Sequence, residues 1–428
     1  MAAADPGILD DLGADIWTSR SNAVMWFGEG LAKLAESWDK VFEHLISSFT
    51  AHAGESSHPY VLSGFIGCIH ASAPTQAQAM LKIALQTRGL KRHAVLLLAA
   101  APITSWASAC LLQLARSGEL PAVSFQYLSF GRIHETIQDS EFASLLSAIL
   151  ALDDGYLATI ELLHMRFHEM EARKYCPIPD LQAVARASIR ALLSEHRDSV
   201  RQVPAHRLDD ILEIGFGPSA PLSEVQQIID ILCEGIETYR LYAFEMGHVT
   251  SALLRMHPEI FLDTVFTRDN ERRCVADTLF RERSSSDRPS LNDAPLDRFM
   301  AWCGDDQQHI QDLADAVNSF VACGSVSPLE DHPACMTLSP HIKALFTAAK
   351  DKSAIVEIIF GHVRPSSWSG SRAKIMEIRS KAFKELLQHS DATVQAQVQA
   401  KLYLLEDAIR AEHEREAAEQ HSREQRFE

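Results

Sequence analysis

Two histidines lie at a spacing that could hold a metal ion. His164 and His168 stand four residues apart in the string HMRFHE, so on a helix their side chains would share one face. A catalytic zinc helix carries a glutamate directly after its first histidine and needs a third ligand, whereas Met165 follows here. We therefore predict an ordinary helix surface beside Glu169 and Glu171, and metal binding is the alternative.

A second set of potential zinc ligands combines two cysteines with two histidines. Cys323, His332, Cys335 and His341 follow the spacing C-x8-H-x2-C-x5-H. Structural zinc sites normally hold their ligands in closely spaced pairs, and this spacing matches no common site. The pattern favours a loop before the next pair of helices, and a zinc site is the alternative.

Motifs for nucleotide binding and nucleophilic catalysis are missing from the sequence. Gly215-Phe216-Gly217-Pro218 looks like a phosphate-binding turn, but it follows no predicted strand and puts proline where a backbone N–H would be needed. There is no G-x-S-x-G nucleophile elbow. The best basic cluster, Arg88, Lys91, Arg92 and His93, has no interleaved aromatic residues and is typical of a helix end. We therefore predict no catalytic, cofactor-binding or metal-ligating residues, and a chain that is not an enzyme.

The string Trp368-Ser369-Gly370-Ser371 precedes a predicted helix. Ser369 or Ser371 can accept a hydrogen bond from the first free backbone N–H groups of that helix. We predict that Trp368 packs as a structural corner against the preceding helix, around residues 355–360. The alternative is an exposed binding anchor, because exposed tryptophans concentrate interface energy.

The composition excludes several classes of protein. Hydrophobic residues make up 46% of the 428 residues and charged residues 23%, which predicts a folded chain with a sizeable core. Glycine, with 19 residues, and proline, with 17, are scarce enough to argue against collagen-like, turn-rich all-β and disordered chains. The net charge of −17 repels phosphate backbones, so nucleic acid is an unfavoured partner and a basic or neutral protein is favoured.

The cysteines and the N-terminal residues indicate in which cellular compartment the protein is located. The eight cysteines occur singly, without a C-x-x-C pair, at positions 68, 110, 176, 233, 274, 303, 323 and 335. This distribution argues against a disulfide framework and favours buried thiols in a reducing cytosol. The start MAAADPGILDD lacks the basic residues and apolar core of a signal peptide. We therefore expect a cytoplasmic protein.

One apolar stretch has the length of a membrane span. Residues 94–112 carry no charge, but Pro102 stands near the centre and Thr104, Ser105 and Ser108 follow it. Because proline breaks a helix, we predict two buried helices joined at Ala101-Pro102 and no membrane partner.

Apolar residues recur at three- and four-residue steps along the chain, most clearly over 31–46, 225–239 and 394–409. Short breaks separate these segments, and alternating β-type runs are missing. Amphipathic hairpins must bury their apolar faces on their neighbours. We therefore predict an all-α fold, a HEAT-like α-solenoid of stacked helical hairpins with degenerate repeats of about forty residues.

We predict four parts: an N-terminal helical-repeat array over 1–265, an irregular linker or loop region over 266–295, a C-terminal array over 296–405, and a charged helical tail over 406–428. One hairpin is especially clear: a helix over 371–388, a turn at Ser390-Asp391, and a second helix from Ala392. Few apolar residues follow Ile409, so we expect a solvated extension whose removal leaves folding nearly intact.

Several strings resemble the helical C-terminal regions of large bacterial multidomain proteins: WFGEGLAKLAESWDKVFEHL, VSFQYLSFGRIHE, LATIELLHMRF, HPEIFLDTVF, DRFMAWCGDD, WSGSRAKIMEIRSKAFKELLQHSDATVQ and REQRFE. Such regions are similar to HEAT-like solenoids that follow NACHT or STAND-type NTPase modules, or sirtuin-like effector modules, in proteins of antiphage defence. The resemblance implies a helical-repeat fold and carries over no catalytic residue. The enzymatic or nucleotide-binding module of that family has no counterpart here.

We therefore expect a non-enzymatic helical-repeat scaffold or sensor without a cofactor. The resemblance implies a protein partner, either a phage protein or an NTPase or effector module of the same system. The alternatives are a metal-dependent enzyme on a helical scaffold, using the histidines at 164 and 168 or the 323–341 cluster, and a nucleic-acid-binding helical-repeat protein.

Overall fold

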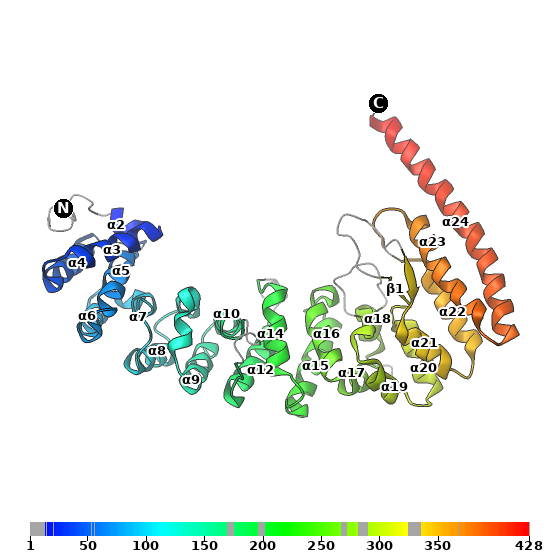
Figure 1. The fold of residues 1–428 in the computed structure, drawn as a ribbon, viewed down its shortest axis with the longest axis horizontal. Helices are drawn as coiled ribbons and strands as arrows, with labels where there is room; N and C mark the ends of the chain where they lie inside the picture. The colour runs from blue at the N-terminus through cyan, green and yellow to red at the C-terminus, as the bar shows by residue number, and fades with distance from the viewer. Residues whose placement is uncertain are drawn as a thin grey trace. The chain divides into compact units, whose positions relative to one another are not determined.

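The computed structural model describes residues 13, 15–19, 21–52, 54, 56–168, 175–195, 202–266, 272–280, 290–323, 335–366 and 368–427. Within these residues the chain is predominantly helical, and two three-residue strands form its sheet (Figure 1). The prediction of a helical chain is confirmed. This small hairpin, which the sequence does not predict, leaves the all-α class unchanged.

The chain forms two compact units, Met1–Leu192 (unit 1) and Leu193–Glu428 (unit 2). The division between them falls inside the first predicted array. The elements of unit 1 are α2 (Asp15–Thr18), α3 (Asn22–Leu34), α4 (Trp38–His52), α5 (Tyr60–His70), α6 (Pro74–Gln86), η2 (Lys91–His93), α7 (Ala94–Leu98), α8 (Ser105–Ser117), η3 (Ala122–Thr136), α9 (Asp139–Leu150), α10 (Gly155–Phe167) and α12 (Pro179–Ser194), whose last two residues belong to unit 2.

The uncharged stretch 94–112 forms two helices, as predicted. Every residue of α7 is buried, and the chain breaks before α8 in a segment that contains Pro102. The Thr104 hydroxyl then accepts a hydrogen bond from the Ala107 amide at 3.3 Å and caps α8. Among the described helices, none combines the length and the apolar character needed to cross a membrane.

Large aromatic side chains fill the core at the start of unit 1. Trp17 of α2 and Phe49 of α4 pack edge to face, with their ring centroids 5.1 Å apart. The buried indole N–H of Trp17 donates to the Ser48 hydroxyl at 3.2 Å, so its burial leaves no polar group unsatisfied. Phe65 of α5 is also fully buried in this cluster. The short helix α2 is therefore fixed to the array by its tryptophan.

The elements of unit 2 are α14 (Ala205–Gly215), α15 (Leu222–Glu237), η4 (Ala243–Glu245), α16 (Gly247–Met256), α17 (Pro258–Val265), α18 (Arg273–Phe280), η5 (Leu291–Asp293), α19 (Leu296–Cys303), α20 (Gln307–Ala316), β1 (Phe320–Ala322), β2 (Met336–Leu338), α21 (Pro340–Ala348), α22 (Lys352–Val363), α23 (Arg372–Phe383), η6 (Lys384–Gln388) and α24 (Ala392–Phe427). The predicted hairpin over 371–388 and from Ala392 is confirmed as α23, η6 and α24. The expected irregular region 266–295 contains a helix, α18, while residues 267–271 and 281–289 lie outside the described residues.

Within each unit, helices contact the next but one along the chain as well as the next. In unit 1, α3 packs extensively against α5, and α5 also contacts α6. In unit 2 the next-but-one contacts run from α14 with α16 through α15 with α17, α17 with α19, α19 with α21, and α20 with α22, to α22 with α24. The two strands pair antiparallel, with Phe320 opposite Leu338, and β2 lies against α23.

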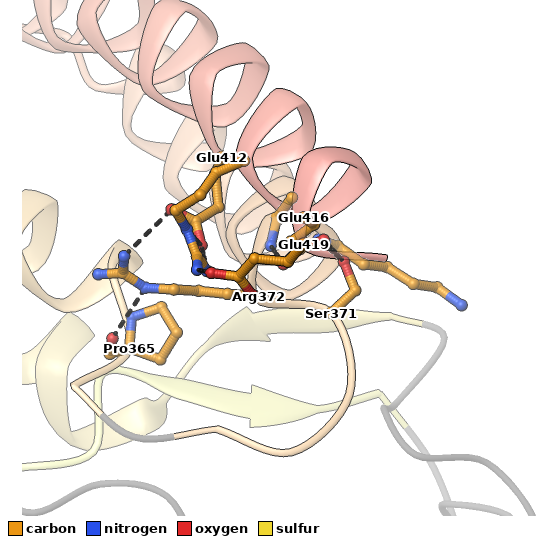
Figure 2. A network of polar contacts seen from close by, with 9 residues as sticks. Pro365, Ser371, Arg372, Glu412, Glu416 and Glu419 are labelled. Atoms are coloured by element: carbon orange, nitrogen blue, oxygen red, sulfur yellow. Dashed lines mark hydrogen bonds and ion pairs between the residues drawn. The ribbon is translucent and has the colours of Figure 1, made fainter. Parts of the chain in front are cut away.

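The charged end of α24 contacts the start of α23. Figure 2 shows Glu412 and Glu416, from the last part of the long helix, beside the loop that leads into α23. Arg372 donates to the Glu412 carboxylate at 3.3 Å and to the Pro365 carbonyl at 3.3 Å. The Ala373 amide donates to Glu416 at 3.1 Å. Residues 410–425 are otherwise largely exposed along α24, so the expected solvated helix extension holds except at these contacts with α23.

Candidate protein-binding groove

An open groove of about 740 Å³ lies in unit 1, between α3, α5, the end of α7 and the 3-10 segment η3. We call it the unit 1 groove. Its volume lies in the range of cavities that bind small molecules or peptide side chains. Its aromatic residues come from α5 and η3, its small residues mainly from α5 and the end of α7, and its charged residues from α3.

Glycines allow the helices that form the groove to approach one another closely. A Cβ atom on Gly28 of α3 would lie 2.1 Å from the Val61 carbonyl oxygen of α5. In the reverse direction, a Cβ on Gly64 would lie 1.9 Å from the Met25 carbonyl oxygen. Both obstacles are backbone atoms of a packed helix, so no side-chain rotation could relieve them. Since Met25 and Gly64 line the groove, its α3–α5 side depends on the two glycines.

Two aromatic residues of η3 form another side of the groove. Tyr127 and Phe130 pack edge to face with ring centroids 6.0 Å apart, and Phe130 is 66% exposed. The backbone turns directly after Phe130, because Gly131 and Arg132 both adopt positive φ angles, of 62° and 61°. Arg132 then donates to Glu135 at 2.7 Å. This turn presents the phenyl ring of Phe130 to solvent at the groove.

A pair of opposite charges lies on the α3 side of the groove. Lys33 Nζ lies 3.9 Å from the Glu29 carboxylate, and the two side chains are 66% and 40% exposed. An exposed pair at this distance contributes little to stability, so both charges are available to a ligand. A groove lined by an exposed aromatic ring, small residues and charges of both signs suits an apolar peptide side chain flanked by polar residues.

The groove could not be recognised from the sequence alone. Its possible signals were the glycines at 28, 64 and 67 within strongly apolar helical segments, together with the Phe130-Gly131 string. The glycines indicate close backbone approach only once their partners are known. A Cβ on Gly67, for example, would lie 2.4 Å from the carbonyl oxygen of Ala100, in the turn after α7.

The structure places His164 and His168 together at the end of α10. Their rings lie 5.8 Å apart, and His168 is the residue that ends the helix. Glu169 and Glu171 lie outside the described residues. Across the parts of the chain that the structure describes, no three histidine, cysteine, aspartate or glutamate side chains gather in a group that could hold a metal ion.

The structure divides the second candidate ligand set, which was the alternative to a loop. Cys323 and Cys335 lie side by side at the ends of β1 and β2, with their sulfur atoms 2.6 Å apart. His341 points elsewhere: it is buried in α21, and its Nε2 lies 2.9 Å from the carbonyl oxygen of Ala294. Burial lowers the pKa of His341, which favours the neutral ring in this contact. His332 lies outside the described residues.

Unit 2 contains a row of residues that sequence reasoning missed. The hydroxyl of Ser319 lies 2.6 Å from His362 Nδ1, and His362 Nε2 lies 3.9 Å from an Asp315 carboxylate oxygen. These are the residue types of a hydrolytic triad. However, Ser319 is only 1% exposed, so a substrate has no approach to its hydroxyl. We interpret the row as a structural contact between α20, β1 and α22.

Of the two predictions for the Trp368–Ser371 string, one is confirmed and one is wrong. Ser371 caps α23 as predicted, because its hydroxyl accepts a hydrogen bond from the Lys374 amide at 3.1 Å. Trp368 does not fill a buried corner. It is 40% exposed, and its ring lies 4.7 Å from the guanidinium of Arg372. The loop that reaches α23 is fixed by polar contacts, so the tryptophan is not needed as a plug.

The remaining sequence candidates occupy structural positions. Gly215 ends α14, and the following segment leads to α15 as a loop, as predicted. Within the basic cluster, Lys91 pairs with Glu119, and Arg92 donates to the Gly54 carbonyl. Burial, followed by the nearby charge of Arg92, lowers the pKa of His93 to about 4. The cluster therefore forms a helix end, as predicted.

Comparison with known proteins adds no relative. No protein-family model matches the chain, and no curated protein sequence matches it.

Proposed function

We propose that the chain is a non-enzymatic, HEAT-like helical-repeat scaffold or sensor that binds a protein partner in the unit 1 groove. The observation that carries the proposal is the exposed ring of Phe130, placed by a left-handed turn beside Tyr127 in a groove that glycines help to form. Exposed aromatic anchors beside a cavity are the residues that dominate binding energy in protein interfaces.

The contact pattern of the helices supports a repeat architecture. Each helical hairpin of a solenoid buries its apolar face on the preceding and following hairpins, so helices contact their next-but-one neighbours. The pairs from α14 with α16 to α22 with α24 in unit 2 follow this order. The pair of α3 with α5 does the same in unit 1.

The charge of the chain favours a basic or neutral partner. A net charge of −17 attracts positively charged surfaces and slows the approach of acidic ones. We extend the proposal to a cytoplasmic role in bacterial antiphage defence, in which the partner is a phage protein or an NTPase or effector module. This extension rests on the resemblance of the sequence strings alone.

Co-purification from the cells that encode the chain tests the proposal. The tagged full chain is compared with Phe130→Ala and with Tyr239→Ala, a matched control that removes an 80% exposed aromatic ring from unit 2. We expect a protein that is recovered equally with the full chain and with Tyr239→Ala, and at least tenfold less with Phe130→Ala. Equal recovery with all three chains would contradict the groove as the binding site. Circular dichroism checks that both variants fold.

A further inference from the structure

The small hairpin of unit 2 brings two exposed cysteines together across its ends. The ladder pairs Phe320 with Leu338 and Ala322 with Met336, so the next cross-strand pair is Cys323 with Cys335. The Cys323 amide donates to the Cys335 carbonyl at 3.0 Å and continues the ladder. In an antiparallel pair of this kind the Cα atoms lie about 5.5 Å apart, within the separation that a disulfide can bridge.

The sulfur atoms themselves face each other. Cys323 Sγ and Cys335 Sγ lie 2.6 Å apart, and both residues are exposed. Cys233 and Cys303 are buried, where oxidants cannot reach them. Proximity and access, the two requirements for thiol oxidation, therefore coincide at Cys323 and Cys335.

Contacts that do not involve sulfur hold the two strands in place. Phe320 and Leu338 are buried on the inner side of the hairpin, and the Ser339 amide donates to the Ser319 carbonyl at 2.9 Å. The Thr337 hydroxyl donates to the Glu385 carboxylate at 2.7 Å and so ties β2 to η6. The two thiols are thus positioned by the fold in the reduced chain, which makes their joining an intramolecular step between aligned groups.

We propose that Cys323 and Cys335 are a redox-active pair that forms a reversible disulfide across the ends of β1 and β2. This site is independent of the proposed partner binding in unit 1. The exposure of both residues corrects the expectation from the sequence that the cysteines are buried thiols.

A low-molecular-weight disulfide, such as oxidised glutathione, is the oxidant. The thiolate of one cysteine attacks a sulfur of the small disulfide; a mixed disulfide forms, the small S–S bond breaks, and one small thiolate leaves. The thiolate of the other cysteine then attacks the protein sulfur of the mixed disulfide, which forms the Cys323–Cys335 bond and releases the second small thiolate. The two protein thiols together lose two electrons and two protons. The small disulfide is reduced to two thiols, which take up the protons.

The surroundings of the pair set the conditions for the test. The pKa of the Cys323 thiol is raised, mainly by its hydrogen bond with Cys335. The charge of Glu385 raises this pKa further, and the charge of Lys343 lowers it. Because the thiolate is the attacking species, oxidation is faster at mildly alkaline pH.

The experiment equilibrates the reduced full chain in a series of glutathione buffers at mildly alkaline pH, from fully reduced to fully oxidised. Free thiols are then alkylated, and the digested chain is analysed by mass spectrometry. We expect a peptide pair joined through Cys323 and Cys335 whose fraction rises with the oxidised share of glutathione and returns to zero on reduction.

Two variants separate the pair from general thiol reactivity. Cys323→Ser should abolish the joined peptide and leave Cys335 as a glutathione adduct. Cys176→Ser, which removes an exposed cysteine of unit 1, should leave the joined peptide unchanged. Alkylation of both Cys323 and Cys335 in the most oxidising buffer would overturn the proposal, as would glutathione adducts on both without an internal bond.

Discussion

Ser371 and Glu416 connect the start of α23 to the charged end of α24: the Ser371 hydroxyl donates to the Glu416 carboxylate at 2.7 Å while it caps its own helix. The same carboxylate accepts the Ala373 amide at 3.1 Å. An anion at a helix N-terminus satisfies free amide groups and interacts favourably with the helix dipole. The end of the chain therefore stabilises unit 2 although it buries little apolar surface.

Removal of the Glu416 carboxylate should loosen this contact. We expect Glu416→Ala to lower the free energy of unfolding of unit 2 by about 1 kcal/mol, because two donors at the α23 N-terminus lose their acceptor. Glu414→Ala, at an exposed position of the same helix, is the matched control and should change little. Hydrogen exchange in peptides from α23 and α24 measures the difference. Equal protection in both variants would show that the contact contributes nothing.

The contribution of Glu416 should also depend on pH. Its partial burial acts to raise its pKa, but the hydrogen bonds from Ser371 and the backbone prevail and hold the pKa below the ordinary 4.5. A lowered pKa in the folded state gives stability that is complete above the unfolded pKa and is lost as the pH falls through the folded value. The difference in the free energy of unfolding between the full chain and Glu416→Ala should therefore be constant near neutral pH. It should become smaller below about pH 4.5. A difference in unfolding free energy that grows on acidification would contradict a lowered pKa of Glu416.

The glycines of the unit 1 groove offer a paired test within one helix. Gly28→Ala should destabilise unit 1 by about 1–3 kcal/mol or more, because the new Cβ would meet the Val61 carbonyl. Gly30→Ala, two residues along α3, meets no atom within 4 Å and should stabilise the helix by about 0.5–1 kcal/mol. Thermal unfolding and hydrogen exchange of α3 and α5 compare the two. A destabilising effect of similar size at both positions would argue against the close helix contact.

Trp368 and Phe383 allow an exposed aromatic residue to be compared with a buried one near the same helix. Trp368→Ala should cost no more than about 1 kcal/mol, the scale of a cation–π contact such as the one with Arg372. Phe383→Ala, which removes a fully buried ring of α23, should cost about 3–5 kcal/mol. Denaturation of the two variants gives the comparison. A loss of several kcal/mol for Trp368→Ala would restore the packed corner that the sequence analysis expected.

Local signals in the sequence predicted the helices and their ends. The break at Pro102, the turn at Ser390-Asp391 and the cap at Ser371 are properties of a few neighbouring residues, and the structure has all three. Proline geometry and side-chain capping act within one helical turn, so no knowledge of the distant chain is needed.

Contacts between distant segments could not be predicted in the same way. The charged residues after Ile409 have the composition of a solvated helix face, and only the position of Ser371 reveals that Glu416 has a partner. In the same way, the sequence shows Gly28 only as a residue of low helix propensity. Its role in helix packing follows from the position of the Val61 carbonyl. The glycines and carboxylates were visible in the sequence, but their roles depend on how the helices pack.

Photocrosslinking from the groove tests the central claim, partner binding by unit 1, most directly. A photoreactive benzoylphenylalanine replaces Phe130 in one chain and the control residue Tyr239 in another, and each full chain is irradiated in the cells that encode it. We expect one discrete crosslinked protein from position 130 that is missing from position 239, and co-expression of unlabelled chain should reduce its yield. No discrete product from position 130, or the same products from both positions, would contradict it.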